Sequence, residues 1–392
     1  GGTKLQRRKG IEDSPEAHFR DIMRINCGAG DKILIKKAVD EAPHTIDWLD
    51  DNGFEFAPEA PRIIYGHVPY TAPRTHYGVH NGYSILSVLE KEWNKYVERG
   101  HIKLLLNAEL HSIEKHNNKF DAVTYKLLDQ EYSISADHII FATGGYGSDV
   151  SYFNKKHKNI PLISACYPTA TGDGHRILEA NNAHFRMADL HLPSLGGIEL
   201  SPGRADFNQA WAMVLTSIYR RPTDIYINAE GHRFMNEDEV DADVRERAVM
   251  KQPGWFFYVI FDDRALHATN EKGEENPIII GWNADKIKKH VNSLDDLHQA
   301  DSIEKLATKL DINPKVLETT LSTFNQAVDH QKDIQFHRAY LTNKIIDPPF
   351  YALKVHASVL VTFGGIKVNE KLQIIDDEGK VMNGLYGCGE LL

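Results

Sequence analysis

Apolar runs that end in paired glycines constrain the fold of this chain more than any other feature of its sequence. His138-Ile139-Ile140-Phe141-Ala142 leads directly into Thr143-Gly144-Gly145. Such a run is typical of a buried strand, and the glycines after it allow a tight turn or a close approach of the backbone to a ligand. Similar clusters follow at Thr171-Gly172-Asp173-Gly174, Gly364-Gly365 and Gly387-Cys388-Gly389-Glu390. Each cluster alone is compatible with a tight turn, whereas the ordered series favours a site for a flat or phosphorylated ligand.

The first 150 residues combine helical and strand patterns. Ser14-Pro15-Glu16 predicts a helix start, because serine caps the helix, proline suits its first position and an acid suits its positive end. Apolar residues at helical spacing predict two further core helices, one that ends at Gly53 and one over 84–99. We expect strands at 103–107, 121–127, 131–135 and 138–142, which makes this part of the chain α/β.

The pattern changes between about residues 190 and 357. Aromatic and proline-punctuated segments mix there with capped helices, such as the one that Asn313-Pro314 opens. Glycine-rich strand-turn-strand sequence then returns over 364–390. We therefore predict a second, α+β domain that is inserted into the first one.

Composition excludes several classes of protein and site. The net charge is −10, which argues against nucleic acid and anionic membranes as main partners. The three cysteines are scattered, and no apolar run approaches the ~18 residues of a membrane span. The G-x-G pairs lack the third glycine of a dinucleotide fingerprint. His76 and His80 are separated by Gly78, so we predict no metal site.

The order of the clusters resembles the flavoprotein family of fumarate reductase and succinate dehydrogenase, in its divergent FAD-dependent dehydrogenase branch. The matching stretches run from the first residue to the last: Gly2–Gln6 with Gly10–Glu16, Ile46–Leu49, Arg74–His76, Ala142–Gly145, Thr171–Gly174, Ile227-Asn228 with Gly231–Phe234 and Asn236-Glu237, Thr362–Gly365 and Gly384–Glu390. Each motif is degenerate, whereas the ordered set is specific.

The resemblance implies a split Rossmann-like FAD-binding domain, at 1–189 and 358–392, around a capping domain at 190–357. It implies FAD as the cofactor and a fragment that lacks the first βαβ unit, which carries the dinucleotide glycines, and the end of the family's chain. The expected compartment is the cytoplasm. The residues assigned to the cofactor are Gly1, Gly2, Thr3, Leu110, Ala142, Thr143, Gly144, Gly145, Thr171, Gly172, Asp173, Gly364, Gly365, Gly389 and Glu390.

The same resemblance predicts hydride transfer between flavin N5 and a carbon–carbon bond activated by a carbonyl or carboxylate. Fumarate itself is disfavoured, because Asp241 stands where the family has an acid arginine and Leu360 where it has a histidine. Arg220 matches a relay arginine by its spacing from Arg233. The candidate catalytic residues are Arg220, Arg221, Tyr219, His76, His356 and Tyr351.

Two other functions remain open at this point. One is a 3-ketosteroid-dehydrogenase-like enzyme, which would use tyrosines in place of arginines near the flavin. The other is a non-catalytic, truncated flavoprotein that serves as a binding module. We expect a small-molecule carboxylate or ketone as the substrate, whereas the electron partner cannot be read from the residues.

Overall fold

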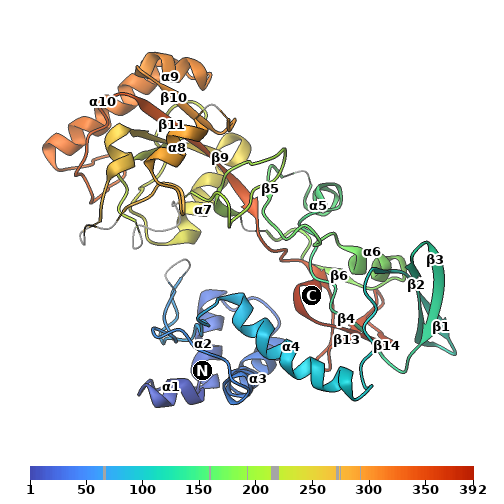
Figure 1. The fold of residues 1–392 in the computed structure, drawn as a ribbon. Helices are drawn as coiled ribbons and strands as arrows, with labels where there is room; N and C mark the ends of the chain where they lie inside the picture. The colour runs from blue at the N-terminus through green and yellow to red at the C-terminus, as the bar shows by residue number, and fades with distance from the viewer. Residues whose placement is uncertain are drawn as a thin grey trace. The chain divides into compact units, whose positions relative to one another are not determined.

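The computed structural model describes residues 1–64, 68–158, 160–191, 193–212, 220–270, 273, 275–291 and 293–392. The chain forms two compact units (Figure 1). Unit 1 comprises Gly1–Phe141, Ala180–His184 and Lys367–Cys388, and unit 2 comprises Ala142–Glu179, Phe185–Ile366 and Gly389–Leu392. Among the described residues, no helix has the length and apolar character that crossing a membrane requires.

Unit 1 begins with capped helices. These are α1 (Lys4–Arg8), α2 (Pro15–Ile25), α3 (Lys32–Asp51) and α4 (Gly82–Glu98). The Ser14 hydroxyl accepts a hydrogen bond from the backbone N–H of Ala17, and Pro15 occupies the first position of α2, as predicted. Leu49, Phe54 and Val88 form a small apolar core that joins α3 to α4.

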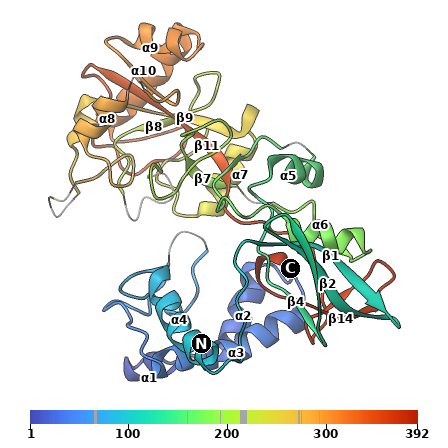
Figure 2. The same cartoon turned by 45° about the vertical axis from the view of Figure 1, so that its right-hand side comes forward.

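Two sheets complete unit 1 (Figure 2). The first is an antiparallel meander of β1 (Ala108–His116), β2 (Lys119–Leu127) and β3 (Gln130–Ser135). The second has the order β13 (Gln373–Ile375), β14 (Val381–Gly387) and β4 (Ile139–Phe141). β4 and β14 are parallel although they lie far apart in the chain.

Unit 2 is built around the strand β11 (Phe350–Val359), which is buried along almost its whole length. It lies between β10 (Leu297–Ala300) and β9 (Phe256–Asp262), and β8 (Ile225–Ile227) extends the sheet beyond β9. The short strands β5 (Ile163–Ser164) and β7 (Ser194–Gly197) pair with the end of β11. The remaining strands, β6 (Phe185–Arg186) and β12 (Gly365–Ile366), form a separate pair.

Helices cover this sheet with the apolar faces that the sequence predicts. In α10 (Pro314–His330), Leu317, Leu321, Phe324 and Val328 are buried in one core with residues of β8, β9 and β11. Burial of each such side chain contributes roughly 1.5–3 kcal/mol. The other helices of unit 2 are α5 (Val150–His157), α6 (Asp173–Ala180), α7 (Ala242–Met250), α8 (Ala284–His290), α9 (Ile303–Lys309) and the 3-10 turns Pro253–Trp255, Asp263–His267 and Gly389–Leu391.

Two predictions about unit 1 are wrong. Residues 103–107 form no strand, and Leu104 and Leu106 are 57% and 68% exposed, because no described strand pairs with this segment. The helix α4 exists, but its apolar face of Ile85, Leu86, Leu89 and Trp93 is exposed rather than buried in a core. Both errors have one cause: an apolar pattern predicts burial only where another element is present to cover it.

Candidate functional site

The glycine clusters of unit 2 converge on the carboxylate of Glu390. This carboxylate accepts hydrogen bonds from the backbone N–H of Thr362 (2.8 Å) and from its Oγ1 (3.0 Å). A Cβ on Gly145 would lie 2.2 Å from Oε1 of Glu390 and 2.5 Å from Oγ1 of Thr362. Glycine at position 145 therefore leaves the space that the Glu390 side chain occupies.

The cluster at 171–174 packs on the same loop. The backbone N–H of Gly172 donates to the carbonyl of Gly145 (3.1 Å), and Gly174 faces Thr143, whose Oγ1 lies 2.1 Å from the position of a Cβ at residue 174. Gly365 is packed as tightly, with the carbonyl oxygen of Leu391 only 2.3 Å from where a Cβ would be. The structure thus brings together clusters that are widely separated in the sequence.

Part of this loop system is open to a ligand. Gly144 and Gly389 both have positive φ (74° and 75°), and no heavy atom lies within 4 Å of a Cβ built on either one. Within the described parts of the chain, the backbone N–H groups of Thr143, Gly144 and Gly145 donate no hydrogen bond. Free backbone N–H groups in a glycine loop are suited to phosphate oxygens or to the carbonyls of a flat ring system. These residues therefore fit a dinucleotide cofactor with a fused aromatic ring.

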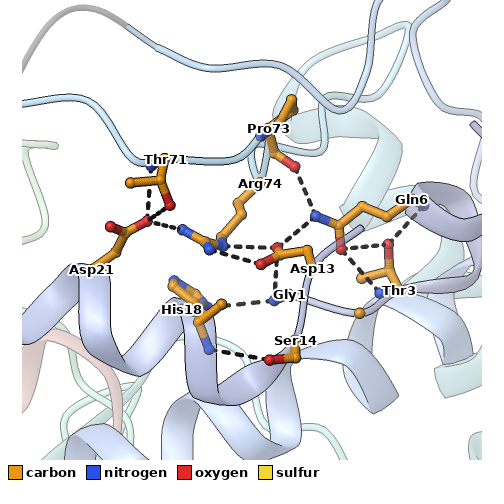
Figure 3. A network of polar contacts seen from close by, with 12 residues as sticks. Gly1, Thr3, Gln6, Asp13, Ser14, His18, Asp21, Thr71, Pro73 and Arg74 are labelled. Carbon is orange, nitrogen blue, oxygen red and sulfur yellow. Dashed lines mark hydrogen bonds and ion pairs between the residues drawn. The ribbon is translucent and has the colours of Figure 1, made fainter. Parts of the chain in front are cut away.

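In unit 1, Arg74 joins two carboxylates (Figure 3). Its guanidinium contacts Asp13 (Nη2 to Oδ1, 2.7 Å) and Asp21 (Nη1 to Oδ2, 2.5 Å), and its side chain is only 3% exposed. Burial alone would raise the pKa of Asp21, but hydrogen bonds from Arg74 and Thr71 outweigh burial and lower that pKa. Gln6 donates to Asp13 as well, so the network ties α1 to the segment around residue 74.

This network holds the first predicted cofactor residues together with His76. The Oγ1 of Thr3 and Nε2 of His76 are 3.0 Å apart, and Nδ1 of His76 is 2.8 Å from the carbonyl of Arg74. A proton on Nδ1 satisfies both contacts, and burial lowers the pKa of His76. Gly1 and Gly2 pack against 13–15, whereas Leu110 lies in β1 opposite Tyr125 of β2.

The arginines predicted as catalytic differ in their surroundings. Arg220 is 4% exposed, and its guanidinium forms an ion pair with the buried Asp224. Arg221 is exposed, with its guanidinium 4.3 Å from the ring centroid of Tyr340. Tyr219 lies outside the described residues. Asp241 caps α7 by accepting a hydrogen bond from the N–H of Asp243.

The two candidates on β11 have separate surroundings. The ring of Tyr351 is stacked on Phe261 with centroids 5.1 Å apart, and its hydroxyl is 3.3 Å from Oδ1 of Asp263. Burial, with a smaller effect of Asp263, raises the pKa of Tyr351. His356 contacts Asp296 through Nε2 at 3.0 Å.

A cavity in unit 2 contains a candidate site residue that sequence reasoning missed. It has a volume of about 640 Å³ and is lined by residues of 165–169 and 200–209, among them Arg204, Tyr167 and Phe207. Nη2 of Arg204 donates to the carbonyl of Cys166 (3.2 Å), and no carboxylate of a described residue forms an ion pair with Arg204. Tyr167 and Phe207 are 77% and 44% exposed, so the cavity offers a cation beside accessible aromatic rings.

The signal for Arg204 in the sequence is weak. It follows Ser201-Pro202-Gly203, and the structure forms a turn there in which Arg204 N–H donates to the Ser201 carbonyl. A turn motif does not predict which cavity an arginine lines. A larger cavity of about 820 Å³ in unit 1 is lined by Asn181, Asn182 and the 376–383 turn, and contains none of the predicted site residues.

Comparison with known proteins identifies the family. A model described as an FAD binding domain matches residues 2–392. The chain belongs to this family. FAD is therefore its cofactor, as predicted, and the open glycine loops of unit 2 fit that assignment.

Relatives and solved structures agree with this family. A probable fumarate reductase from Shewanella frigidimarina is 26% identical over 398 residues, with 100% of this chain and 61% of the relative covered. The chain thus spans 61% of the length of that relative. An open-conformation structure of a flavocytochrome c3 fumarate reductase matches with a TM-score of 0.74 at 23% identity, covering 100% of this chain and 64% of that one.

A second structural match is the 3-ketosteroid Δ1-dehydrogenase of Sterolibacterium denitrificans. Its TM-score is 0.73 at 17% identity, covering 97% of this chain and 84% of that one. At this identity the match shows the fold alone. The predicted fold, an FAD-binding flavoenzyme of mixed helix and sheet, is confirmed by both structures.

Proposed function

We propose that the protein is an FAD-dependent oxidoreductase that transfers a hydride to or from a carbon–carbon bond activated by a carboxylate or carbonyl. The observation that carries the proposal is the open glycine loop system around Gly145 and Glu390, in the unit that also contains the Arg204 cavity. Bound FAD would supply the hydride or accept it. The residues of this chain would bind and orient the two reactants and stabilise the charge that develops on the substrate.

The cofactor residues remain those that the sequence assigned. In unit 2, Ala142–Gly145, Thr171–Asp173, Gly364-Gly365 and Gly389-Glu390 would hold FAD, with support from the contacts that join these clusters. In unit 1, Gly1–Thr3 and Leu110 remain predictions. The division into a FAD-binding domain at 1–189 and 358–392 and a capping domain at 190–357 is likewise a proposal.

Arg204 is the residue that we propose to bind the activating group of the substrate. Its planar guanidinium has no carboxylate partner among the described residues, so it is available for a substrate carboxylate or enolate oxygen. The Asp206 carboxylate does not compete for the Arg204 guanidinium. Its Oδ1 accepts a hydrogen bond from the backbone N–H of Asn208, and its Oδ2 accepts one from Nε2 of Gln209. Tyr167 and Phe207 would contact an apolar part of the substrate.

We propose that fumarate is not the substrate. The Asp241 carboxylate already caps α7 and would repel a dicarboxylate, and Leu360 offers no hydrogen bond to a carboxylate. The proposed contributors to catalysis remain Arg220, Arg221, Tyr219, His76, His356 and Tyr351. No membrane span occurs among the described helices, and the electron partner and compartment are not proposed.

A 3-ketosteroid-like activity is the second candidate, and it is supported by the fold match alone. It would need a tyrosine hydroxyl near the substrate carbonyl, whereas the Tyr351 side chain is buried and its hydroxyl contacts Asp263. A non-catalytic binding module is the third candidate. It predicts bound flavin that no unsaturated acid or ketone reoxidises.

The test is reoxidation of the reduced, FAD-loaded protein under anaerobic conditions by a panel of unsaturated monocarboxylates, fumarate and a 3-ketosteroid. We expect a monocarboxylate to react, and Arg204→Gln to lower kcat/KM by roughly 10–150-fold, which corresponds to one lost charged hydrogen bond of ~1.5–3 kcal/mol. Arg264→Gln is the control, because Arg264 is half exposed and paired with Asp347. Reaction with none of the panel, or an Arg204→Gln enzyme as active as the control, would contradict the proposal.

A further inference from the structure

Glu199, Asp296 and His356 form a cluster in unit 2, and neither of its two carboxylates has a role in the proposed function. Glu199 follows β7, Asp296 precedes β10 and His356 lies in β11, so three separate segments contribute. Nε2 of His356 is 3.0 and 3.1 Å from the two oxygens of Asp296 and 3.8 Å from Oε2 of Glu199. One donor atom of each residue lies within 4.8 Å of the other two.

The cluster carries excess negative charge in a mostly buried place. Asp296 is 3% and His356 is 9% exposed. Neither carboxylate forms an ion pair with a lysine or arginine of the described chain. Two carboxylates with a neutral imidazole give a charge of −2, and a protonated imidazole compensates only half of it. A divalent cation would neutralise the cluster fully.

In each carboxylate, one oxygen accepts a hydrogen bond from a backbone N–H, and the other oxygen lies on the side of His356. Oδ2 of Asp296 accepts the backbone N–H of Glu199 (2.6 Å), which leaves Oδ1 facing the imidazole. Oε1 of Glu199 accepts the N–H of Gly203 (2.6 Å), which leaves Oε2 on the side of His356. Outer hydrogen bonds of this kind orient the ligands of a metal site.

The spacing of the donor atoms suits a small transition metal. Zn²⁺ with bonds of about 2.0–2.2 Å in tetrahedral geometry places its ligand atoms roughly 3.3–3.5 Å apart. The measured separations of 3.0 and 3.8 Å from Nε2 bracket this range. The Glu199 side chain is 32% exposed, so the cluster has an open side for entry of the ion and for a water ligand.

We propose that Glu199, Asp296 and His356 bind one divalent transition metal ion of the zinc type. The donor set of one imidazole and two carboxylates suits such an ion better than Mg²⁺, which prefers oxygen ligands alone. Because Glu199 also holds Gly203, the ion would fix the 199–204 turn to the central strand β11. The proposal goes beyond the flavin chemistry and does not depend on it.

The test is titration of the chelator-treated, metal-free protein with Zn²⁺ by calorimetry, with thermal unfolding measured in parallel. We expect one high-affinity site per chain, a higher Tm with Zn²⁺, and at least ~10-fold weaker binding in Glu199→Gln and His356→Asn. Glu199→Gln is the more informative variant, because this half-exposed side chain tolerates an isosteric change, and circular dichroism checks its fold.

The matched control is His116→Asn. His116 contacts Asp121 (Nδ1 to Oδ1, 2.6 Å) in an exposed pair that lacks a third ligand, so its loss should leave the high-affinity site unchanged. Three results would each overturn the proposal: no stoichiometric Zn²⁺ site, equal affinity in wild type and Glu199→Gln, or Mg²⁺ binding as tight as Zn²⁺. Any of these would leave the cluster as a histidine in contact with two carboxylates and without a metal-binding role.

Discussion

Replacement of Gly145 by alanine tests the geometry of the glycine loops directly. The new Cβ would lie 2.2 Å from Oε1 of Glu390, far inside van der Waals contact. Gly145 has no positive φ, so the change adds no backbone strain and acts through this clash and through a second one, with Oγ1 of Thr362 at 2.5 Å. The Glu390 carboxylate is the flexible end of its side chain and would rotate away from Gly145.

The structure sets the size of the effect. Rotation of Glu390 breaks one or both of its hydrogen bonds from Thr362, at 2.8 and 3.0 Å. A hydrogen bond to a charged group contributes about 1.5–3 kcal/mol, so we expect the free energy of unfolding to fall by that amount for each bond lost. FAD affinity should fall by at least roughly 10-fold, since one such bond corresponds to about 10–150-fold and the loop that loses it is the one we propose to bind the cofactor.

The assay combines urea unfolding, which needs no cofactor, with a fluorescence titration of FAD. Gly82→Ala is the control, because Gly82 has no positive φ and no atom within 4 Å of the added Cβ. A double-mutant cycle with Glu390→Ala isolates the clash with the carboxylate. In that background only Oγ1 of Thr362 crowds the new Cβ, so Gly145→Ala should cost less, with a coupling of about 0.5–3 kcal/mol. If Gly145→Ala costs the same with and without Glu390, the clash is not the cause and the reasoning fails.

Three further predictions concern two buried charges of unit 2. Glu246 is 1% exposed, and burial raises its pKa to about 8. The free energy of unfolding should therefore decline as the pH rises from 4.5, the pKa of this carboxyl in the unfolded chain, through 8. Glu246→Gln should abolish that decline, which unfolding curves at pH 5 and 8 would measure. Arg220→Ala should lower the free energy of unfolding by about 3–5 kcal/mol, because it leaves the buried Asp224 carboxylate unpaired. The double variant with Asp224→Asn should recover part of this loss. If the effects of the two substitutions simply add, the ion-pair explanation is contradicted. Arg220→Lys keeps the positive charge but loses the planar guanidinium with its paired N–H donors. If Arg220 also relays a proton, this change should lower kcat by ~10²–10³-fold and leave the flavin content unchanged. Unchanged turnover would exclude that role.

Local features of the sequence were enough to determine most helices of this protein. Ser14 and Pro15 start α2, and Asn313 and Pro314 start α10, where the sequence predicts them. Capping hydrogen bonds and apolar spacing act within one or two helical turns, so all the interacting groups lie close together in the sequence. The ordered glycine clusters also determined the family, because each cluster marks a backbone position that only glycine can occupy.

Strand pairing and burial were decided by the tertiary structure. Residues 103–107 have the apolar pattern of a strand but no partner in the described chain, whereas β4 and β14 pair across most of the sequence. A strand hydrogen bonds only to another strand, so its existence depends on residues that periodicity does not identify. The same limit applies to α4, whose apolar face is exposed although its spacing predicts a core.

The candidate site depended most on tertiary structure. The sequence pointed to Gly145 and Glu390 separately, and only the fold places the carboxylate in the space that the missing side chain leaves. It assigned Arg220 to a site but not to a buried ion pair, and it gave Arg204 no role at all. Whether a charged side chain is paired, buried or available to a ligand depends on neighbours from other segments, because electrostatic and packing forces act through space and not along the chain.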